Sequence, residues 1–384
     1  MKEKLKLRDS NTTLIDLDDI SFLRDLSLII DSEEGIHLTI AGMLFVGKEK
    51  SIKQLLPQAE LIYLHYNDNN LEEYDNRIDL RMPIISALDR LAETIKPYNR
   101  ITNIQVGLFR IEVYDFSEKV FQEAILNAFS HRRYDSPGAI YVKHYPNRIV
   151  IESPGGFVDD ITEDNIITHP SVARNKLIAE TLQRLKYVQR SGQGIDIIFK
   201  EMVSMGKRYP EYVSYGDAIR LTLYSTMEDV SFVEFIIETQ EKKQRTFNLP
   251  ELMILRYLYE NKTISLTEAS KITQIPIREI KHIIQEMNKQ SLVESSGKVY
   301  MLTAKVYSKV KSKVEYVQDK SVTYLKAKDL VLEYLEENTE ISNAIIQELC
   351  RCTKRQSDGI IKKMKEAGLL AQVGQGRGTK YILK

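Results

Sequence analysis

Cysteine is nearly absent from this chain of 384 residues, and the two that it has, Cys350 and Cys352, are one residue apart. A disulfide across so short a spacing would be strained, and two thiolates do not complete the four ligands of a structural zinc site. We therefore expect both to be reduced thiols, which is the usual state of cysteine in the cytoplasm.

Long apolar runs and a nucleotide-motor motif are also missing. No stretch approaches the ~20 apolar residues of a membrane-spanning helix, and Met1–Lys4 leads into no signal core. The sequence therefore predicts a cytoplasmic protein with no membrane partner. The stretch Gly374–Lys380 (GQGRGTK) has the wrong spacing for a Walker A motif, so a helicase motor is not expected.

Net charge is absent too, since 54 Lys and Arg balance 54 Asp and Glu. The balance is uneven along the chain, however. Residues 251–384 hold 23 Lys and Arg against 16 Asp and Glu, which leaves 31 against 38 in residues 1–250. A basic C-terminal third on an acidic body favours a polyanionic partner at that end.

The length is enough for about two to four domains, each with its own core. We expect an N-terminal α/β region in residues 1–115, in which we find no chemistry. Its predicted elements are helices at 20–28, 38–46 and 82–95 and strands at 61–65, 77–80 and 104–114.

The most informative stretch is Ser117–Tyr134, SEKVFQEAILNAFSHRRY. Its apolar residues recur at helical spacing, and Ser117 is a suitable N-cap. Glu123 and Asn127 are four residues apart and so point the same way, one turn from each other. A carboxylate placed there can deprotonate a water, and an amide oxygen can bind Mg²⁺. For this pair alone, a solvated helix face is the simpler interpretation.

Two glycine motifs strengthen the functional interpretation. A β-branched stretch from Ile149 ends in Pro154-Gly155-Gly156, and Gly192-Gln193-Gly194 opens an apolar helix that we expect to run to Val203. Glycine lets the backbone approach a ligand closely, and a glycine turn at a helix start points free N–H groups at an anion. Either motif alone is a simple turn, but the order acidic helix, strand with glycines and G-x-G helix is more specific.

These boxes make residues 118–224 resemble the ATP-binding domain of the GHKL superfamily, the Bergerat fold of gyrase, histidine kinases and MutL. The likeness is closest to a bacterial "RecG-like" family of transcriptional regulators. Its pattern E-A-x-x-N-A-x-x-H-R-x-Y, S-P-G-G, R-N-x-x-x-A and G-x-G-I is met at Glu123–Tyr134, Ser153–Gly156, Arg174–Ala179 and Gly192–Ile195. The family usually carries an AlbA/Schlafen-type nucleic-acid-binding domain ahead of this region, which this sequence lacks.

The resemblance implies an ATP-binding domain in residues 116–226 with ATP and Mg²⁺ as cofactors. It makes Glu123 the water-activating acid and Asn127 the magnesium ligand. The remaining nucleotide-binding candidates are His131, Ser153, Gly155, Gly156, Arg174, Asn175, Gly192 and Gly194. For Arg174 and Asn175 the choice lies between phosphate contacts from a lid in residues 168–185 and an ordinary helix with an exposed arginine.

One position departs from the wider superfamily, which has an aspartate that accepts a hydrogen bond from the adenine amino group. This chain has Ser153 there, as the RecG-like family does. A hydroxyl accepts that bond more weakly than a carboxylate does, so adenine selectivity is an open point.

The C-terminal region contains an internal repeat. After a predicted linker at 227–250, residues 251–304 and 328–384 each show the order helix, helix, helix, β-hairpin, with Ser265 and Ser342 in matching N-cap positions. This is the winged helix-turn-helix pattern. Between the two units, residues 305–327 form either a linker helix or a dimer contact.

Winged helices commonly place the third helix in the major groove of double-stranded DNA. Basic residues on that helix neutralise phosphates, while Gln and Arg read base edges. The alternative is a protein-interaction module with a solvated basic face; two basic copies favour DNA. The candidate DNA-binding residues are Arg278, Lys281, His282, Gln285, Lys289, Lys354, Arg355, Gln356, Lys362, Arg377 and Lys380.

The sequence thus predicts an α+β protein: a Bergerat two-layer α/β sandwich with an N-terminal α/β layer and two C-terminal winged-helix domains. The expected function is a DNA-binding regulator in which Mg-ATP modulates the winged helices, with at most slow ATP hydrolysis. Two alternatives stay open. One is a nucleotide-independent DNA-binding or scaffold protein with a degenerate ATP site. The other is an ATPase subunit of a nucleic-acid-processing or defence assembly, whose partner protein carries a nucleic-acid-binding domain. The expected partners are therefore double-stranded DNA, with a homodimer or such a partner protein as further options.

Overall fold

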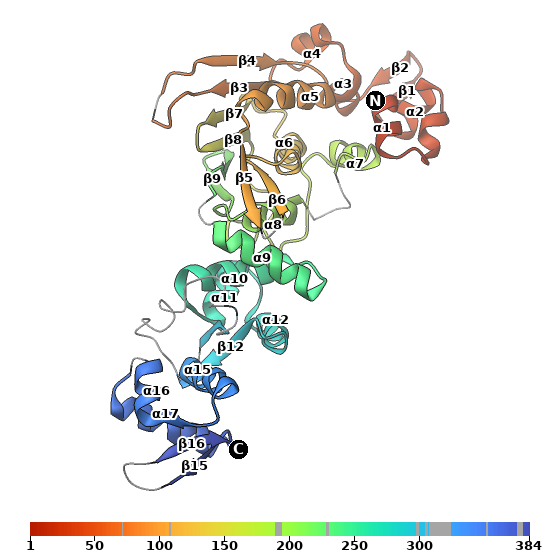
Figure 1. Cartoon of the computed structure of the whole chain (residues 1–384). Coiled ribbons are helices and arrows are strands. Elements are labelled where there is room, and N and C mark those ends of the chain that lie inside the picture. The colour runs from red at the N-terminus through yellow and green to blue at the C-terminus, as the bar shows by residue number, and fades with distance from the viewer. Residues whose placement is uncertain are drawn as a thin grey trace. The chain divides into compact units, whose positions relative to one another are not determined.

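The structure is a computed structural model of residues 1–384, and it divides into two compact units, Met1–Glu238 and Thr239–Lys384 (Figure 1). Each unit is described by itself. The described residues are all except 71, 107–108, 189–193, 228–229, 297–298, 304–305, 307–323, 351 and 375–378. Within these ranges, no helix has both the length and the apolar character needed to cross a membrane.

A six-stranded mixed sheet forms the centre of the first unit, in the order β4-β3-β7-β8-β10-β9. β3 and β7 run parallel, and every other neighbouring pair is antiparallel. The strands are β3 (Leu61–His65), β4 (Asn76–Leu80), β7 (Ile140–Tyr145), β8 (Arg148–Pro154), β9 (Glu211–Tyr215) and β10 (Ala218–Tyr224). The predicted α+β class is confirmed, and strands from both sides of the predicted boundary at 115/116 belong to one sheet.

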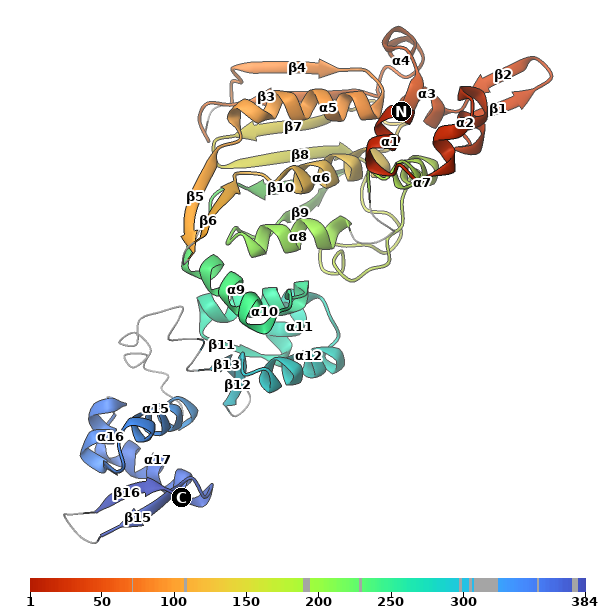
Figure 2. The same ribbon diagram turned by 45° about the vertical axis from the view of Figure 1, so that its right-hand side comes forward.

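One face of this sheet carries three helices, α5 (Ile84–Ile95), α6 (Glu118–His131) and α8 (Gly194–Ser204), as Figure 2 shows. Each helix turns its apolar side to the sheet. On α6 the predicted apolar residues Val120, Phe121, Ala124, Ile125 and Ala128 are all buried. Burial of such a stripe, rather than helix propensity, supplies most of a helix's stability. The sheet and these helices therefore share one core.

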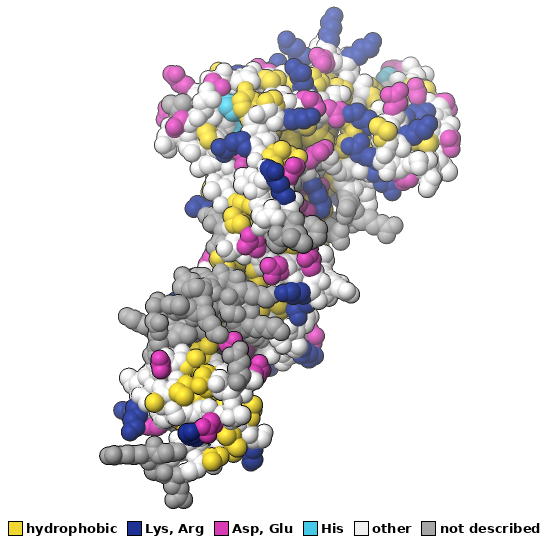
Figure 3. All heavy atoms as spheres, viewed as in Figure 1, with side chains coloured by type: hydrophobic (Ala, Val, Ile, Leu, Met, Phe, Trp, Pro, Cys, Tyr) yellow, Lys and Arg dark blue, Asp and Glu magenta, His cyan; other side chains and the backbone are white. Residues whose placement is uncertain are grey.

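The segment before β3 folds as small helices and a hairpin that pack on the same core. The predicted helices at 20–28 and 38–46 are present but shorter than expected. Figure 3 shows Lys and Arg side chains gathered over α4 at the top of the view, where Lys50 and Lys53 are exposed. The elements are α1 (Lys2–Arg8), η1 (Thr13–Asp16), α2 (Asp19–Asp25), β1 (Ile29–Ser32), β2 (Gly35–Leu38), α3 (Ile40–Val46) and α4 (Glu49–Leu55).

Two expectations for this unit differ from the structure. The single strand predicted at 104–114 is an antiparallel hairpin of β5 (Ile101–Val106) and β6 (Phe109–Tyr114). Both strands alternate between apolar and polar residues, so this pattern alone does not distinguish one long strand from two paired strands. The predicted linker at 227–250 contains a helix, α9 (Val230–Lys243), because Val233 is buried against the hairpin residues Ile104 and Val113. Two short helices complete the unit: η2 (Lys96–Tyr98) and α7 (Lys176–Arg184).

The second unit contains two segments with the same order of elements. In each, three helices are followed by a hairpin whose second strand also pairs with a short strand after the first helix. The first has α10 (Leu249–Asn261), β11 (Thr263–Ser265), α11 (Leu266–Thr273), α12 (Ile277–Lys289), β12 (Val293–Ser296) and β13 (Val299–Leu302). The second has α15 (Tyr324–Glu337), β14 (Ile341–Ser342), α16 (Asn343–Leu349), α17 (Lys354–Glu366), β15 (Leu370–Val373) and β16 (Lys380–Leu383).

The matching serines occupy the predicted cap positions. The Ser265 hydroxyl accepts a hydrogen bond from the Glu268 amide at 3.2 Å, and the Ser342 hydroxyl accepts one from the Ile345 amide at 3.3 Å. Each thereby satisfies a backbone N–H that would otherwise lack a partner at a helix start. The predicted internal repeat of elements and caps is confirmed.

Candidate functional site

Helix α6 presents the predicted acid and amide toward α8 and the sheet. The Ser117 hydroxyl caps its start by accepting from the Val120 amide at 3.2 Å. From this start, Glu123, Asn127 and His131 follow at intervals of four residues and so lie along one side of the helix. Glu123 is only 7% exposed, which is unusual for a carboxylate and already argues against a solvated helix face.

A cavity of ≈ 130 Å³ opens beside this side of α6. Its floor is the helix-facing side of the sheet, where Ile151 and Ser153 of β8 lie beside Ile219 and Leu221 of β10. Most of its wall is apolar, and its polar side chains are few, which is typical of a small-molecule site. The full lining is Ala124, Asn127, Ala128, His131, Ile151, Ser153, Gly155, Gly156, Phe157, Val158, Ile161, Ile166, His169, Pro170, Ser171, Val172, Gly194, Ile195, Tyr212, Ile219 and Leu221.

Gly194 allows the start of α8 to approach α6 closely. A Cβ placed on Gly194 would lie 2.4 Å from Glu123 Oε1 and 3.2 Å from Asn127 Nδ2. A side chain at this position would fit only if the Glu123 carboxylate moved, and glycine avoids that displacement. The helix start therefore lies directly against the acid and amide of α6, as the order of motifs predicts. Gly192 lies outside the described residues.

Burial changes the acidity of Glu123. Desolvation raises the pKa of its carboxyl to about 7, while the Lys119 ammonium acts in the opposite direction. Lys119 is itself bonded to Glu201 at 2.9 Å. A general base is most effective when its pKa lies near the working pH, so this burial suits Glu123 to proton transfer near neutrality.

Asn127 lines the cavity and brings a hard oxygen ligand to it. Among the residues that the structure describes, no group of three or more His, Cys, Asp and Glu is arranged to hold a metal. Magnesium commonly takes only one or two protein oxygens and completes its shell with phosphates and water. Asn127 therefore fits magnesium that arrives with a phosphorylated ligand, and does not fit a metal held by protein alone.

The first glycine turn is tied to the end of α6. Gly155 has φ +104°, a conformation that favours glycine, and its amide donates to the Asp217 carbonyl at 2.7 Å. The Arg133 amide in turn donates to the Pro154 carbonyl at 2.8 Å. Gly155 and Gly156 both line the cavity, as predicted for glycines beside a ligand.

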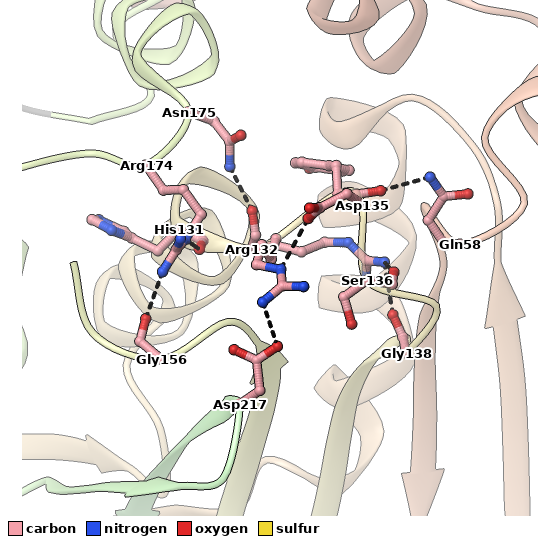
Figure 4. Close-up of polar contacts among 12 residues, drawn as sticks. Gln58, His131, Arg132, Asp135, Ser136, Gly138, Gly156, Arg174, Asn175 and Asp217 are labelled. Atoms are coloured by element: carbon pink, nitrogen blue, oxygen red, sulfur yellow. Dashed lines mark hydrogen bonds and ion pairs between the residues drawn. The ribbon is translucent and has the colours of Figure 1, made fainter.

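Arg174 and Asn175 bind the backbone at the end of α6 (Figure 4). Arg174 donates to the carbonyls of His131 and Gly156 at 2.9 and 2.8 Å. The Asn175 amide donates to the carbonyls of Ser130 and Arg132 at 3.0 and 2.7 Å. These bonds satisfy carbonyls that lack partners at a helix end. Neither side chain lines the cavity, so the structure gives both a positioning role, and their predicted phosphate contact stays a prediction.

Ser153 and His131 supply polar groups with a defined character. The Ser153 hydroxyl donates its proton to the Ala128 carbonyl at 3.2 Å, so it presents only acceptor lone pairs to the cavity. Burial lowers the pKa of His131 to about 4, with a further contribution from Arg174. His131 is therefore a neutral imidazole at neutral pH and adds no charge to the site.

Sequence reasoning missed most of the wall formed by residues 157–172. Phe157, Ile161, Ile166 and His169 line the cavity, whereas the lid was expected at 168–185. Tyr212 of β9 was also missed, and its hydroxyl is buried without a hydrogen-bond partner among the described residues. The loop has no periodicity that marks it as a wall, and only alternation along β9 could have indicated Tyr212.

The predicted DNA-binding residues lie in the second unit. All five candidates on α12 are exposed, as are Lys354, Arg355, Gln356 and Lys362 on α17 and Lys380 on β16. Some are engaged locally: the Gln356 amide oxygen accepts from the Thr353 amide at 2.9 Å, and Lys380 bonds Glu340. Arg377 lies outside the described residues. Lys363 and Lys365 are further exposed lysines of α17 that the sequence reasoning did not select.

The raised pKa of Glu123 makes the stability of the first unit depend on pH. Above pH 7 the buried carboxyl is ionised and costs free energy, whereas below pH 4.5 it is neutral in both folded and unfolded chains. We expect Glu123→Gln to raise the free energy of unfolding by about 2 kcal/mol at pH 8, with little difference at pH 4.5. Urea titrations at both pH values measure this.

The control for that comparison is Glu180→Gln, which changes an exposed carboxylate on α7. It is expected to leave the free energy of unfolding within about 0.5 kcal/mol at both pH values. Equal effects of the two substitutions at pH 8 would contradict the burial of an ionisable Glu123.

Comparisons with known proteins bear on parts of the chain. Residues 138–223 match the family described as "Putative ATP-dependent DNA helicase recG C-terminal", and residues 1–62 match a "Domain of unknown function (DUF8451)". No curated protein matches. A solved structure with a similar fold is the DIP2311 protein from Corynebacterium diphtheriae, at a TM-score of 0.65 and 18% identity, covering 100% of this chain and 67% of that one. The family match agrees with the RecG-like resemblance over residues 138–223.

Proposed function

We propose that the first unit binds Mg-ATP in a GHKL-type site and that this binding modulates DNA binding by winged helices in the second unit. The observation that carries the proposal is the pair formed by the buried Glu123 and the half-buried Asn127. It lies where the start of α8 meets α6, beside a cavity with a glycine turn in its lining. The match of residues 138–223 to a family named for an ATP-dependent protein supports the same ligand.

Each part of the cavity suits one part of the nucleotide. The apolar floor of Ile151, Ile219 and Leu221 suits the face of a purine, whose stacking surface is itself apolar. Asn127 supplies an oxygen to magnesium bound by the phosphates. The start of α8 lies at the same place, and a helix start favours negative charge. Bound there, Mg-ATP is expected to leave its terminal phosphate nearest Glu123.

The chemistry of this site is binding with at most slow hydrolysis. Glu123 has the pKa of an effective base near neutrality and can orient and deprotonate a water. Magnesium, held by Asn127 and the phosphates, supplies charge neutralisation at the phosphoryl group when bound. The sequence has no Walker A motif, so strand separation driven by a helicase motor is not part of the proposal.

Asn127→Ala tests the nucleotide site. Loss of the magnesium ligand is expected to weaken Mg-ATP binding at least tenfold, measured with a fluorescent ATP analogue. Gln122→Ala is the matched control, because Gln122 is an amide on the same helix that bonds the Tyr187 carbonyl at 2.7 Å and does not line the cavity. Equal affinity of wild type and Asn127→Ala, or no binding by either, would overturn the proposal.

Ser153 predicts which base is preferred. Its hydroxyl donates to the Ala128 carbonyl and can therefore only accept a hydrogen bond from the ligand. The amino group of adenine can donate that bond, whereas the oxo group of guanine is itself an acceptor and cannot. We expect ATP to bind more tightly than GTP, and Ser153→Ala to reduce the preference by about fivefold, or ~1 kcal/mol. Competition titrations with both nucleotides measure it. Unchanged discrimination in Ser153→Ala would contradict this assignment of the hydroxyl.

The winged-helix assignment rests on the order of elements and on exposed charge. Both segments of the second unit have three helices and a three-stranded sheet in the order typical of that module. Their third helices, α12 and α17, expose basic side chains together with Gln285 and Gln356. Each helix also exposes two acidic residues, Glu279 and Glu286 on α12 and Asp358 and Glu366 on α17. With four exposed lysines and Arg355 against three Lys and Arg on α12, α17 has the larger positive excess and is the stronger candidate for DNA.

A double substitution tests this face. Arg355→Ala with Lys362→Ala is expected to weaken binding to duplex DNA about tenfold and to lower the salt dependence of binding by about two phosphate contacts. Lys50→Ala with Lys53→Ala is the matched control, since it removes two exposed lysines from α4. Equal losses of DNA affinity in the two double variants would indicate nonspecific charge attraction. Unchanged DNA affinity in Arg355→Ala with Lys362→Ala would show that α17 does not contact the DNA.

Two other functions remain distinguishable from the proposed one. A nucleotide-independent DNA-binding protein is supported by the serine at position 153, and predicts DNA binding that Mg-ATP does not alter. An ATPase subunit of a larger assembly predicts copurification with a partner that carries a nucleic-acid-binding domain. The proposed regulator requires that Mg-ATP change the affinity for DNA, because a ligand shifts an equilibrium only through different affinities for the two states.

A further inference from the structure

The loop between Asp160 and His169 is closed by a side-chain pair at its two ends. His169 Nε2 lies 2.9 Å from Asp160 Oδ1, and His169 Nδ1 lies 2.7 Å from the Pro170 carbonyl oxygen. Within the loop, Asn165 donates to the Asp160 carbonyl at 2.9 Å and accepts from the Thr162 amide at 2.7 Å. The loop is thus held as a compact unit in which the His169–Asp160 pair joins first residue to last.

The partners of the His169 ring define its protonation state. A carboxylate oxygen and a carbonyl oxygen are both hydrogen-bond acceptors, and neither can donate. A neutral imidazole has one N–H and can satisfy only one of them. Both bonds form together only when both ring nitrogens carry hydrogen, which is the charged imidazolium. The geometry therefore requires a protonated His169 in the closed loop.

This closed loop is part of the cavity wall. His169 lines the cavity, and so do Ile161 and Ile166, which lie between the two ends of the loop. Loss of the pair would remove one of several bonds that hold this part of the wall, beside those of Asn165 and of the His169 amide, which donates to the Asn165 carbonyl at 2.8 Å. A second contact attaches the loop to β9 and involves no histidine: the Ser214 amide donates to the Glu163 carboxylate at 2.7 Å.

We propose that the Asp160–His169 pair is a pH-dependent latch on the cavity wall, closed when His169 is protonated and released when it loses its proton. The effect of the latch on nucleotide binding rests on the proposed function of this cavity, whereas its effect on the order of the loop applies to the free protein as well. Release of the latch would lower the affinity for the nucleotide base as the pH rises above neutrality.

The surroundings of His169 agree with this direction. The bond to the Pro170 carbonyl raises the pKa of His169 above its usual 6.5, and Asp160 and Asp159 add to the rise, against desolvation. These two carboxylates are the charged groups that act on the ring in the described part of the chain. Because the folded pKa is raised, the latch is complete below pH 6.5 and is lost as the pH increases through the raised value.

Hydrogen exchange of the nucleotide-free protein tests the latch itself. At about pH 6, amides of residues 160–169 in wild type are expected to be at least fivefold more protected than in His169→Gln, which cannot be charged. At about pH 8.5 the two should exchange alike. A difference of the same size at both pH values would overturn the proposal. This readout needs no ligand, so it stands even if the cavity binds no nucleotide.

The second measurement is nucleotide affinity at the same two pH values. Glu123 titrates over the same range, so the comparison is made in the Glu123→Gln background, where that carboxyl cannot ionise. In this background the dissociation constant for Mg-ATP is expected to rise severalfold from pH 6 to 8.5, and Asp160→Ala, which removes the acceptor for His169 Nε2, should abolish the rise. A rise that persists in Asp160→Ala would overturn the link to this pair.

Glu163→Gln is the matched control in both measurements. It keeps an acceptor for the Ser214 amide and changes a carboxylate of the same loop that does not line the cavity. In Glu163→Gln, the amide protection of residues 160–169 and the dissociation constant for Mg-ATP should depend on pH as they do in the protein with Glu163. A loss of the pH dependence in Glu163→Gln would show that loop charge in general, rather than the Asp160–His169 pair, is responsible.

Discussion

The close approach of two helices at Gly194 is the constraint on which the candidate site depends. Because Gly194 has no Cβ, the start of α8 lies directly against Glu123, a carboxylate that is only 7% exposed. Desolvation of the buried carboxyl raises the pKa of Glu123 to about 7. The same contact brings backbone at the start of α8 to Asn127. The close packing at Gly194 thus accounts for the raised pKa of Glu123 and for the position of the α8 start beside Asn127.

The other end of α6 is held by a different means. Arg174 and Asn175 satisfy carbonyls of the last turn, and Arg174 also joins that turn to Gly156. The glycine turn and the helix end are therefore one rigid piece, and Ser153 is bonded to the same helix through Ala128. A cavity whose polar groups are fixed by their own hydrogen bonds pays less entropy when a ligand binds. The observed bonds of these two residues therefore position the helix end and the glycine turn.

Local parts of this arrangement could be predicted from the sequence. The α6 face and the cap serines depend on neighbours a few residues away, and periodicity and cap chemistry reveal such features. The pairing of β3 with β7 joins residues about 80 positions apart, and no local pattern encodes it. Arg174 was ambiguous for a chemical reason, since a guanidinium donates equally well to phosphates and to carbonyls. The wall at 157–172 has neither repeat nor periodicity, so only the folded loop reveals His169.

Two titrating groups lie at the proposed site, Glu123 against the start of α8 and His169 in the cavity wall, and both affect the binding of a polyphosphate. Glu123 becomes negative as the pH rises, which repels phosphate, whereas His169 becomes neutral, which releases the loop. Both changes therefore weaken binding in the same direction, although they act through different physical causes. Magnesium separates them, because a cation beside Asn127 favours the ionised Glu123 and does nothing for a histidine already bonded to Asp160 and Pro170. A loaded site should thus retain an ionised base at lower pH than the free protein, with the loop still closed over the base.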